Sequence, residues 1–433
     1  MGKKVISPGG TIDGAVEMPG DKSISHRYAI LAALAEGRSE ILNYASAADC
    51  RSTLECLRQL GIVVEKEGHR VRITGAGLHG LKEAKRPLDA ENSGSTMRML
   101  AGVLAGQPFP STLTGDDSLR RRPMRRVIEP LRQMGAEIRS REGDRAPIEI
   151  RGGRLRAIDY TTPIPSAQVK SAILLAGIYA DGITTVRESV CTRDHTELAL
   201  REFGANIEGS RGTIRIHPEP KLTARQLTVP GDLSGAIYMI SAALILPGSS
   251  LMLHNVGLNP TRARVLDFLI SIGASIHIAS VKLRDGELVG DVSVRHTALM
   301  GGSVSGAQVA EMIDELPMLA ALGPFTEKGI EIQDAKELRV KESDRIATLA
   351  EGLRQMGARV EEFPDGMRVE GRSAGKLKGS KVDPHGDHRI AMALAVAALG
   401  SEGDTVIRES ECVAVSFPEF FTTLDRLRGS AVP

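Results

Sequence analysis

Hydrophobic and polar residues along this chain form two recurring patterns, one of buried helices and one of amphipathic helices. In the first pattern, small and polar residues stand directly before a run rich in Ala, Leu and Ile, which predicts a capped and buried helix. Six segments have this design, at residues 20–27, 92–96, 166–168, 231–235, 305–308 and 385–389. Because a helix start presents unpaired N–H groups and a partial positive charge, such segments are suited to bind anions.

The second pattern is an amphipathic helix that ends in a glycine. It occurs five times, and the terminal glycines are Gly61, Gly135, Gly204, Gly273 and Gly357. Each glycine suits the position just after a helix, and a strand-like alternation of apolar and polar residues follows it. The near-constant spacing of these glycines indicates an internally repeated α/β unit.

Six copies of this unit are predicted along the chain. The tail 421–429 supplies the sixth amphipathic helix, and residues 4–18 supply strand material that completes the same last unit. Because the two chain ends meet in one unit, we expect a closed arrangement of two lobes with three units in each.

Composition excludes several classes of function. The chain has 433 residues, 42% of them hydrophobic, so two or three domains with real cores are expected. A net charge of +1 argues against a general polyanion-binding surface. With 3% aromatic residues and no Trp, there are few platforms on which single-stranded nucleic acid could stack. We therefore expect no nucleic-acid partner.

Cysteine usage and hydropathy predict the compartment. The four cysteines have no metal-like spacing and no signal peptide precedes them, which favours a reducing cytoplasm. The longest apolar runs, near residues 172–180 and 391–399, are too short to span a membrane. We expect a soluble, cytoplasmic protein with no membrane partner.

Two short motifs are similar to known sites but fail in detail. Residues 14–23 are similar to a phosphate-binding P-loop, yet they have one residue too many between the glycines and an Asp before the Lys. His385 and His388 are spaced like two metal ligands, but no further soft ligand is near in sequence. We therefore expect neither a P-loop nor a metal site.

Two charged segments have more than one interpretation. Residues 120–126 contain five arginines, which fit a nucleic-acid patch, a solvated face, or an arginine that points into a ligand cleft. In residues 337–346, basic side chains alternate with acids directly before a helix. Alone, this segment would be a surface salt-bridge cluster, but it shares the character of the anion-type helix starts.

The first helix start has a dense cationic character. Lys22 and Arg27 flank the hydroxyls of Ser23 and Ser25. The segment is either an ordinary capped surface helix or an anion site, and the recurrence of such starts along the chain favours the anion site.

Together these motifs resemble those of the EPSP synthase (5-enolpyruvylshikimate-3-phosphate synthase) family over essentially the whole chain. The segments that carry the resemblance are 20–27, 92–98, 122–124, 166–168, 314–317, 339–345 and 387–389. The resemblance implies an α/β fold of two domains, an inside-out α/β barrel with six βαβαββ repeats, three per domain. It also implies that residues 20–232 form one domain, that 1–19 with 233–433 form the other, and that the active site lies in the cleft between them.

The resemblance further implies a reaction of the shikimate pathway, which leads through chorismate to the aromatic amino acids. The substrates would be shikimate 3-phosphate and phosphoenolpyruvate, and no metal or organic cofactor would be needed. The 5-hydroxyl adds to C2 of phosphoenolpyruvate while C3 takes a proton, and the resulting tetrahedral ketal then loses that proton and phosphate. This chemistry requires a base near the hydroxyl, an acid/base near C3, and cations near the phosphates and carboxylates. A monomer is expected.

By the same resemblance, individual residues receive roles. The residues that would bind shikimate 3-phosphate are Lys22, Ser23, Arg27, Ser166, Ala167, Gln168, Arg193, Asp314 and Lys341. The residues that would bind phosphoenolpyruvate are Lys22, Gly94, Arg122, Gln168, Arg345, His388 and Arg389. The catalytic residues would be Asp314, Glu342 and Lys22.

The chain departs from the better-known members of the family at several positions. No Lys stands just before Phe417 and Pro418, Glu337 stands where those members have Asn, and Arg193 where they use a Ser. These differences indicate the more divergent bacterial branch. Glyphosate competes for the phosphoenolpyruvate subsite in this family, and the missing Lys, with Met99 in place of a Pro, predicts intermediate tolerance.

Two other functions fit parts of the sequence. The related transferase that acts on UDP-N-acetylglucosamine has Lys-Asn where this chain has Lys22 and Ser23, and it uses a loop Cys that no cysteine here obviously matches. A non-catalytic protein that binds phosphorylated sugars or RNA ends would keep Lys22 and Arg122. Such a protein would have no need for Asp314 and Glu342 together.

Overall fold

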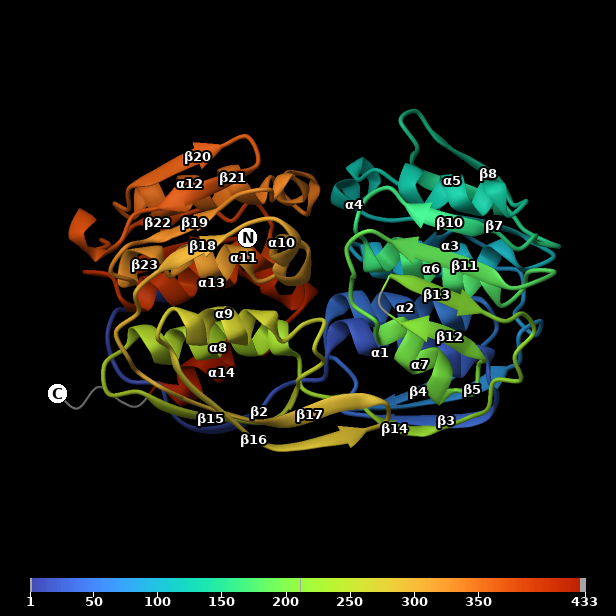
Figure 1. Ribbon diagram of the computed structural model, residues 1–433, viewed down its shortest axis with the longest axis horizontal. Helices are drawn as coiled ribbons and strands as arrows, with labels where there is room; N and C mark the ends of the chain where they lie inside the picture. Colours follow the sequence, from blue (N-terminus) through green and yellow to red (C-terminus); the bar gives the residue numbers. More distant parts are fainter. Residues whose placement is uncertain (1, 211, 429–433) are drawn as a thin grey trace. The chain divides into compact units, whose positions relative to one another are not determined.

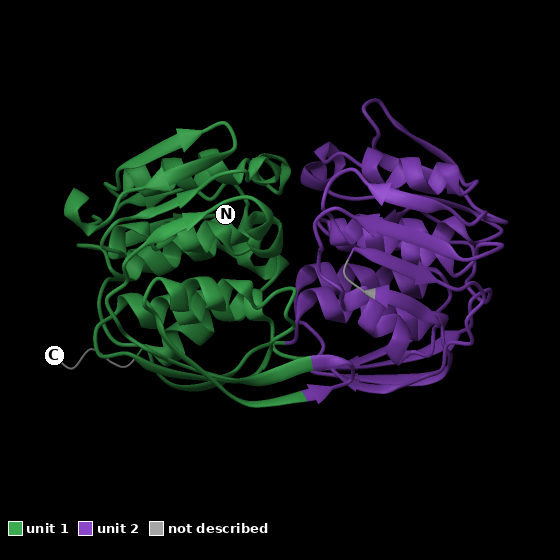
Figure 2. Ribbon diagram, in the orientation of Figure 1, with its two compact units in different colours: residues 1–19, 230–282, 288–433 green, residues 20–229, 283–287 purple. Residues whose placement is uncertain are grey.

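A computed structural model describes residues 2–210 and 212–428 of the chain. It divides into two compact units (Figure 2): unit 1 comprises Met1–Pro19, Pro230–Lys282 and Leu288–Pro433, and unit 2 comprises Gly20–Val229 and Leu283–Glu287. Each unit has its own hydrophobic core. Gly429, the last residue of the predicted tail helix, lies outside the described residues.

Within the described residues, unit 2 contains three four-stranded sheets. Their strands are β3 (Glu36–Leu42), β4 (Val63–Glu67), β5 (Arg70–Ala76), β6 (Leu88–Asp89), β7 (Pro110–Thr114), β8 (Glu137–Arg141), β9 (Arg145–Arg151), β10 (Asp159–Thr162), β11 (Thr184–Glu188), β12 (Ile207–Ser210), β13 (Thr213–Ile216) and β14 (Gln226–Thr228). The strand orders are β14-β3-β5-β4, β6-β7-β9-β8 and β10-β11-β13-β12. In every sheet the first pair is parallel and the other two pairs are antiparallel.

Unit 1 repeats this pattern. Its strands are β1 (Lys3–Ile6), β2 (Asp13–Glu17), β15 (Ser250–Gly257), β16 (Ser275–Arg284), β17 (Glu287–Arg295), β18 (Gly302–Val304), β19 (Ile330–Ile332), β20 (Val360–Phe363), β21 (Gly366–Val369), β22 (Lys381–Val382) and β23 (Thr405–Arg408). The orders are β16-β17-β15-β2, β18-β19-β21-β20 and β1-β23-β22, so the last sheet has three strands in the described part of the chain. β1 completes this last unit, as predicted, whereas β2 pairs with β15 instead.

The helices fall into the two classes that the sequence predicts. The buried helices are α1 (Lys22–Leu34), α3 (Gly94–Ala105), α6 (Ala167–Gly177), α8 (Leu233–Ile245), α11 (Leu316–Ala321) and α13 (His388–Leu399), and in each unit they lie between the sheets (Figure 1). The amphipathic helices are α2 (Ala48–Gln59), α5 (Arg125–Gln133), α7 (His195–Glu202), α9 (Arg264–Ser271), α12 (Arg345–Gln355) and α14 (Phe420–Leu427). The shorter elements are α4 (Asp117–Arg121), α10 (Ala307–Met312), η1 (Gly323–Phe325), η2 (Lys336–Val340), η3 (Arg372–Ala374) and η4 (Ser410–Val415).

These sheets and helices confirm the predicted α/β fold built from repeated units. The five glycines that end amphipathic helices all have positive φ, between 86° and 107°, which is the conformation expected just after a helix.

The predicted helix after residues 305–308 is interrupted. α10 ends at Met312 and α11 starts at Leu316, so Asp314 lies in the break between them. Pro317 stands in the first turn of α11, where its missing N–H costs nothing, whereas inside a continuous helix it would remove a hydrogen bond. The break therefore follows from the proline, and it displays Asp314 outside regular helix.

Two strands belong to one unit although the helix that follows each belongs to the other. β2 pairs with β15 in unit 1, and the chain then enters α1 of unit 2. β14 pairs with β3 in unit 2, and the chain then enters α8 of unit 1. Each crossing thus separates the first strand of a repeat from its own helix.

The units divide the chain at slightly different residues from those predicted. Residues 230–232 belong to unit 1 rather than to the domain expected at 20–232, and Leu283–Glu287 belong to unit 2 rather than to the other domain. Those five residues hold the turn between β16 and β17, and the carbonyl of Asp285 accepts a hydrogen bond from Tyr28 of α1 at 3.1 Å. The placement of the active site between the two domains stays a prediction.

In the described residues, no helix has the length and apolar character that crossing a membrane requires.

Close packing of α3 on α6 depends on one glycine. A Cβ at Gly102 of α3 would lie 2.2 Å from the backbone carbonyl oxygen of Ala172 in α6. Backbone cannot move aside as a flexible side chain can, so we expect Gly102→Ala to destabilise unit 2 by about 1–3 kcal/mol. Urea unfolding followed by far-UV circular dichroism measures this. Gly182→Ala is the control because its Cβ would meet only ordinary contact distances, and equal losses for both variants would contradict the packing argument.

Candidate functional site

Lys22 occupies the start of α1, where the helix is capped and a carboxylate is close. The side chain of Asp21 accepts a hydrogen bond from the N–H of Ile24 at 2.9 Å and so caps the helix. The ammonium of Lys22 lies 2.7 Å from the carboxylate of Asp49 on α2. The Lys22 side chain is 15% exposed, so its charge is fixed in position while one face stays open to a ligand.

Arg27, one turn further along α1, is held by neutral oxygens. Its Nε donates to the hydroxyl of Thr196 at 2.6 Å, its Nη2 donates to the hydroxyl of Ser171 at 2.9 Å, and its Nη1 donates to the carbonyl of Ser23 at 2.8 Å. Burial lowers the pKa of Arg27 to about 10, against the opposing charges of Glu197 and Asp21. The side chain is therefore still a cation at neutral pH.

Arg122 is positioned through an amide. Its Nη2 donates to the side-chain oxygen of Asn92 at 3.0 Å, and the nitrogen of the same amide donates to Asp116 at 2.8 Å. Gly94 begins α3 two residues after Asn92, and a Cβ there would lie 2.5 Å from Nη1 of Arg98. Only a glycine leaves the two guanidinium groups this close to the backbone of the helix start.

The start of α6 joins this arrangement. Gln168 bridges two groups of α3, since its oxygen accepts from Arg98 at 2.6 Å and its nitrogen donates to Ser95 at 2.8 Å. Ser166 caps α6, and the carbonyl of Ala167 accepts from the hydroxyl of Ser171, which also holds Arg27.

Hydrogen bonds link α1 to α6 and α6 to α3, because Arg27 donates to Ser171 and Gln168 contacts Arg98 and Ser95. Arg122 is held through Asn92 and Lys22 through Asp49. Arg193 belongs to the same surroundings, because its charge contributes to the lowered pKa of Arg27. The residues of the prediction that unit 2 contains are Lys22, Ser23, Arg27, Gly94, Arg122, Ser166, Ala167, Gln168 and Arg193.

Unit 1 contains the remaining predicted residues, grouped around two arginines. Arg345 starts α12 and is 1% exposed, with Nε 2.8 Å from Asp387 and Nη2 2.5 Å from Glu342. Its Nη1 lies 3.6 Å from Asp314, and Nη2 of Arg389 lies 3.6 Å from the same carboxylate. Both predicted catalytic acids therefore contact Arg345.

Electrostatics in this cluster follows from burial and from the carboxylates. Burial alone would lower the pKa of Arg345, but Asp387 and Glu342 outweigh it and raise that pKa. Removal from water lowers the pKa of Lys341, while the nearby Asp314 opposes this shift. Lys341 is thus the cation of this group whose positive charge is least stabilised by its surroundings.

α13 supplies the last two predicted ligands. The buried carboxylate of Asp387 caps this helix by accepting from the N–H of Arg389 at 2.9 Å. His388 is the first residue of the helix and is 1% exposed. Asp387 therefore has two roles, because its carboxylate also accepts hydrogen bonds from Arg345 and from the hydroxyl of Ser343.

Sequence reasoning gave no role to several residues that hold the site together. Asp387 and Arg98 lie inside segments that carried the resemblance, so their motifs contained a signal. Asp49 and Thr196 gave none, because they lie 27 and 169 residues from Lys22 and Arg27, the cations that they hold. Asp116 reaches Arg122 only through Asn92.

The metal alternative gains no support from the histidines. His385 is exposed and lies 3.5 Å from Glu351, and no group of three or more His, Cys, Asp or Glu side chains suited to a metal occurs in residues 2–210 and 212–428.

Comparison with known proteins shows the family and the fold to which the chain belongs. The model of a family described as EPSP synthase (3-phosphoshikimate 1-carboxyvinyltransferase) matches residues 6–424. A 3-phosphoshikimate 1-carboxyvinyltransferase of Solibacter usitatus is 54% identical over 98% of this chain and 99% of the relative. The chain belongs to the EPSP synthase family. A relative of the same name from Koribacter versatilis is 52% identical and covers 98% of both chains.

Solved structures agree with this assignment. The EPSP synthase of Acinetobacter baumannii is 38% identical, covers 98% of both chains and superimposes with a TM-score of 0.87. The enolpyruvyl transferase NikO of Streptomyces tendae, at 20% identity and a TM-score of 0.77, shares the fold. As a member of the EPSP synthase family, the chain is an enzyme of enolpyruvyl transfer in the shikimate pathway, and the predicted family and fold are confirmed.

A buried histidine beside the cations of α1 predicts a pH dependence of stability. His26 is fully buried, with Nδ1 2.7 Å from the hydroxyl of Thr53. Burial lowers its pKa well below 6.5, and Lys22 and Arg27 lower it further, while Asp21 opposes them. In the unfolded chain His26 therefore takes up a proton near pH 6.5, whereas in the folded chain it does so only at a lower pH. Unit 2 should keep its full stability above about pH 6.5 and lose up to about 1.4 kcal/mol per pH unit below it.

The measurement is urea unfolding at a series of pH values, for the wild type, His26→Gln and His79→Gln. Glutamine at position 26 keeps a polar partner for Thr53 but cannot titrate, so the loss below pH 6.5 should be smaller in that variant. His79 is 60% exposed, and its replacement should leave the pH dependence unchanged. Identical slopes for all three proteins would show that His26 does not resist protonation.

Proposed function

We propose that the cationic clusters of the two units bind shikimate 3-phosphate and phosphoenolpyruvate, and that Asp314 and Glu342 carry the proton transfers between them. The observation that carries this proposal is the contact of both acids with the buried guanidinium of Arg345, at 3.6 and 2.5 Å. Carboxylates can hold a buried cation in any protein, but an addition–elimination reaction also needs two groups that transfer protons, and Asp314 and Glu342 are suited to that task.

The network of unit 2 suits shikimate 3-phosphate. Arg27 offers a guanidinium whose own partners are hydroxyls and a carbonyl, so its charge is available to a carboxylate. The starts of α1 and α6 would add hydroxyl, backbone and amide groups from Ser23, Ser166, Ala167 and Gln168. Arg193 would add a cation for the phosphate. From unit 1, Lys341 and Asp314 would complete this subsite.

Phosphoenolpyruvate requires cations for a carboxylate and a phosphate. Arg345, His388 and Arg389 would supply them from unit 1, and Lys22, Gly94, Arg122 and Gln168 from unit 2. The active site would then form where the two units face the same substrates. The closely approached backbone of Gly94 allows a phosphate to reach the N–H groups at the start of α3.

In the reaction, the oxygen of the 5-hydroxyl bonds to C2 of phosphoenolpyruvate. One carboxylate takes the hydroxyl proton while a protonated acid gives a proton to C3, and a tetrahedral ketal results. The C3 proton then returns to a carboxylate, the bond from C2 to the phosphate oxygen breaks, and inorganic phosphate leaves with the enol ether. Lys22 and Arg122 would stabilise the charge that develops on the departing phosphate. No step transfers electrons to a carrier, so the reaction needs no redox cofactor.

Compartment and assembly belong to the same proposal. None of the four cysteines, Cys50, Cys56, Cys191 and Cys412, all of them in the described residues, forms a disulfide, and two of them are buried, which suits the reducing cytoplasm. Both substrates would be bound by residues of one chain, so a monomer would suffice for activity. The alternatives, transfer to UDP-N-acetylglucosamine and binding of phosphorylated sugars or RNA ends, make different demands in an assay.

Release of inorganic phosphate tests the function directly. The proposal predicts release only when shikimate 3-phosphate and phosphoenolpyruvate are both present. Release with UDP-N-acetylglucosamine in place of shikimate 3-phosphate would support the related transferase. Binding of either substrate without any release would support the non-catalytic protein.

Replacing each acid separates catalysis from binding. Asp314→Asn and Glu342→Gln keep size and hydrogen-bonding capacity but remove the base, so kcat should fall about a hundredfold or more while substrate binding persists. Glu351→Gln changes an exposed glutamate of the same helix that Arg345 begins and should leave kcat unchanged. If either acid variant loses affinity for shikimate 3-phosphate at near-normal kcat, that residue is a binding group.

The family resemblance implies that glyphosate competes for the phosphoenolpyruvate subsite. We expect Gly94 to determine how well the site distinguishes glyphosate from phosphoenolpyruvate. A Cβ at this position would lie 2.5 Å from Arg98 and 3.4 Å from Arg122. Arg98 cannot move freely because Gln168 holds its Nη1 at 2.6 Å, so the methyl group narrows the site. Glyphosate is longer than phosphoenolpyruvate, and Gly94→Ala should raise its inhibition constant at least about tenfold more than the KM for phosphoenolpyruvate.

Competition kinetics on wild type and Gly94→Ala in one buffer measures both constants. The wild type should show intermediate tolerance of glyphosate, since no Lys stands directly before Phe417. Equal proportional changes in the two constants would mean that the methyl group does not discriminate by ligand length.

A further inference from the structure

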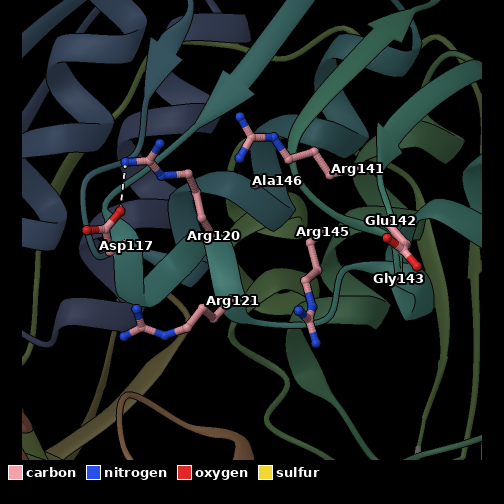
Figure 3. Close-up of a pocket in the computed structure, with 8 residues that line it drawn as sticks. All are labelled: Asp117, Arg120, Arg121, Arg141, Glu142, Gly143, Arg145 and Ala146. Atoms are coloured by element: carbon pink, nitrogen blue, oxygen red, sulfur yellow. Dashed lines mark hydrogen bonds and ion pairs between the residues drawn. The ribbon is translucent and has the colours of Figure 1, made fainter.

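A basic pocket opens in unit 2, and none of the proposed substrate ligands lines it. It has a volume of about 660 Å³ and lies between α4 and the hairpin of β8 and β9. Its lining residues are Asp117, Arg120, Arg121, Arg141, Glu142, Gly143, Arg145 and Ala146. Figure 3 shows the arginines of α4 on one side and those of the hairpin on the other.

The positive charges of this pocket lack compensation. Among the described residues, Arg121, Arg141 and Arg145 make no ion pair, and Arg120 pairs with Asp117 at 3.0 Å. The Nε of Arg120 is buried and has no hydrogen-bond partner. Four guanidinium groups and two carboxylates thus line the pocket. Its net positive charge repels cations and attracts anions.

Other arginines on strands of the same unit do have ion-pair partners. Arg187 of β11 pairs with Asp159 at 2.8 Å, and Arg38 of β3 pairs with Glu65 at 2.7 Å. Each of these has an acid on another strand of its own sheet. Arg141 and Arg145 instead stand opposite each other across the β8–β9 ladder, where like charges destabilise the hairpin. A bound anion would remove that repulsion.

The lining also limits the chemistry of the ligand. Ala146 is its one apolar side chain, and no aromatic side chain lines the pocket on which a base or sugar could stack. The volume exceeds that needed for a single phosphate group. We propose that this pocket binds a compact oxyanion with three or more negative charges, of the polyphosphate or polycarboxylate class.

Such a ligand would link α4 to the hairpin. The two elements already meet through the segment after α4, because the N–H of Met124 donates to the carbonyl of Asp144 in the β8–β9 turn at 2.8 Å. An anion held by Arg120 and Arg121 on one side and by Arg141 and Arg145 on the other adds a second connection. Binding to the folded chain should therefore raise its melting temperature.

Calorimetric titration with inorganic pyrophosphate and, separately, with citrate tests the proposal. The proteins compared are the wild type, the double variant Arg141→Ser/Arg145→Ser, and the matched control Arg139→Ser/Arg151→Ser. The control removes two exposed arginines from the same two strands outside the pocket, so net charge is equal in both variants. Titrations at about 150 mM salt reduce long-range charge effects to those within a Debye length of about 8 Å.

The wild type and the control should bind with equal affinity, and the pocket variant at least about tenfold more weakly. Any anion that occupies the substrate cations does so equally in all three proteins, so this difference reports the pocket. Hydrogen exchange locates the site, with protection by pyrophosphate in residues 117–124 and 137–150 of the wild type and the control.

Four results distinguish the class of the ligand and test the proposal. Binding of pyrophosphate but not citrate selects the polyphosphate class, and the reverse selects the polycarboxylate class. Equal affinities in the pocket variant and the wild type would overturn the proposal. Equal weakening in both double variants would do so too, since it would reflect net charge alone. Melting temperatures without anion show whether each variant is folded.

Discussion

A buried guanidinium or ammonium group needs a partner, and this requirement organises the candidate residues within each unit. Isolated charges are too costly to remove from water, so each must meet a carboxylate or several hydrogen-bond acceptors. Arg345 shows the first solution, with Asp387 at 2.8 Å and Glu342 at 2.5 Å around a side chain that is 1% exposed. Since Asp387 also caps α13, one carboxylate fixes the starts of two helices.

Arg27 shows the second solution. Its donors meet two hydroxyls and a carbonyl, and in the described part of the chain no carboxylate lies within ion-pair distance of it. The orientation of the guanidinium is thus fixed without neutralising its charge. A carboxylate of a substrate can then supply the missing negative charge, which is the property expected of a binding residue. Arg27 is thus a cation without a carboxylate partner in the described residues, whereas Arg345 lies among carboxylates that include Asp314 and Glu342, the proposed catalytic acids.

Much of the fold was predictable because its determinants are local and repeated. The glycines after the amphipathic helices and the small residues before the buried ones recur through the chain, so one unit predicts the others. Three features were not predictable in this way. The pairing of β2 with β15, the pairing of β14 with β3 and the contact of Asp285 with Tyr28 join residues distant in sequence. The break before α11 had a local signal in Pro317 that the helix pattern obscured.

The same distinction applies to the candidate site. Residues inside motifs, such as Lys22, Gly94 and Arg345, were assigned roles that stay predictions. The residues that hold them, such as Asp49 and Thr196, lie on other helices, and only the fold brings them near. A motif therefore identifies the group that meets the ligand better than the group that positions it.

The central claim is that each buried cation among the candidate residues is held by a defined partner, and a double-mutant cycle on Arg345 and Asp387 tests it most directly. Unfolding free energies of unit 1 would be measured for Arg345→Ala, Asp387→Ala and the pair, by urea titration and circular dichroism. Each single change strands a buried group, so the double variant should lose less than the summed losses, with a coupling of about 2–3 kcal/mol. Additive losses would mean that Arg345 and Asp387 contribute to stability independently of each other, which would contradict this claim.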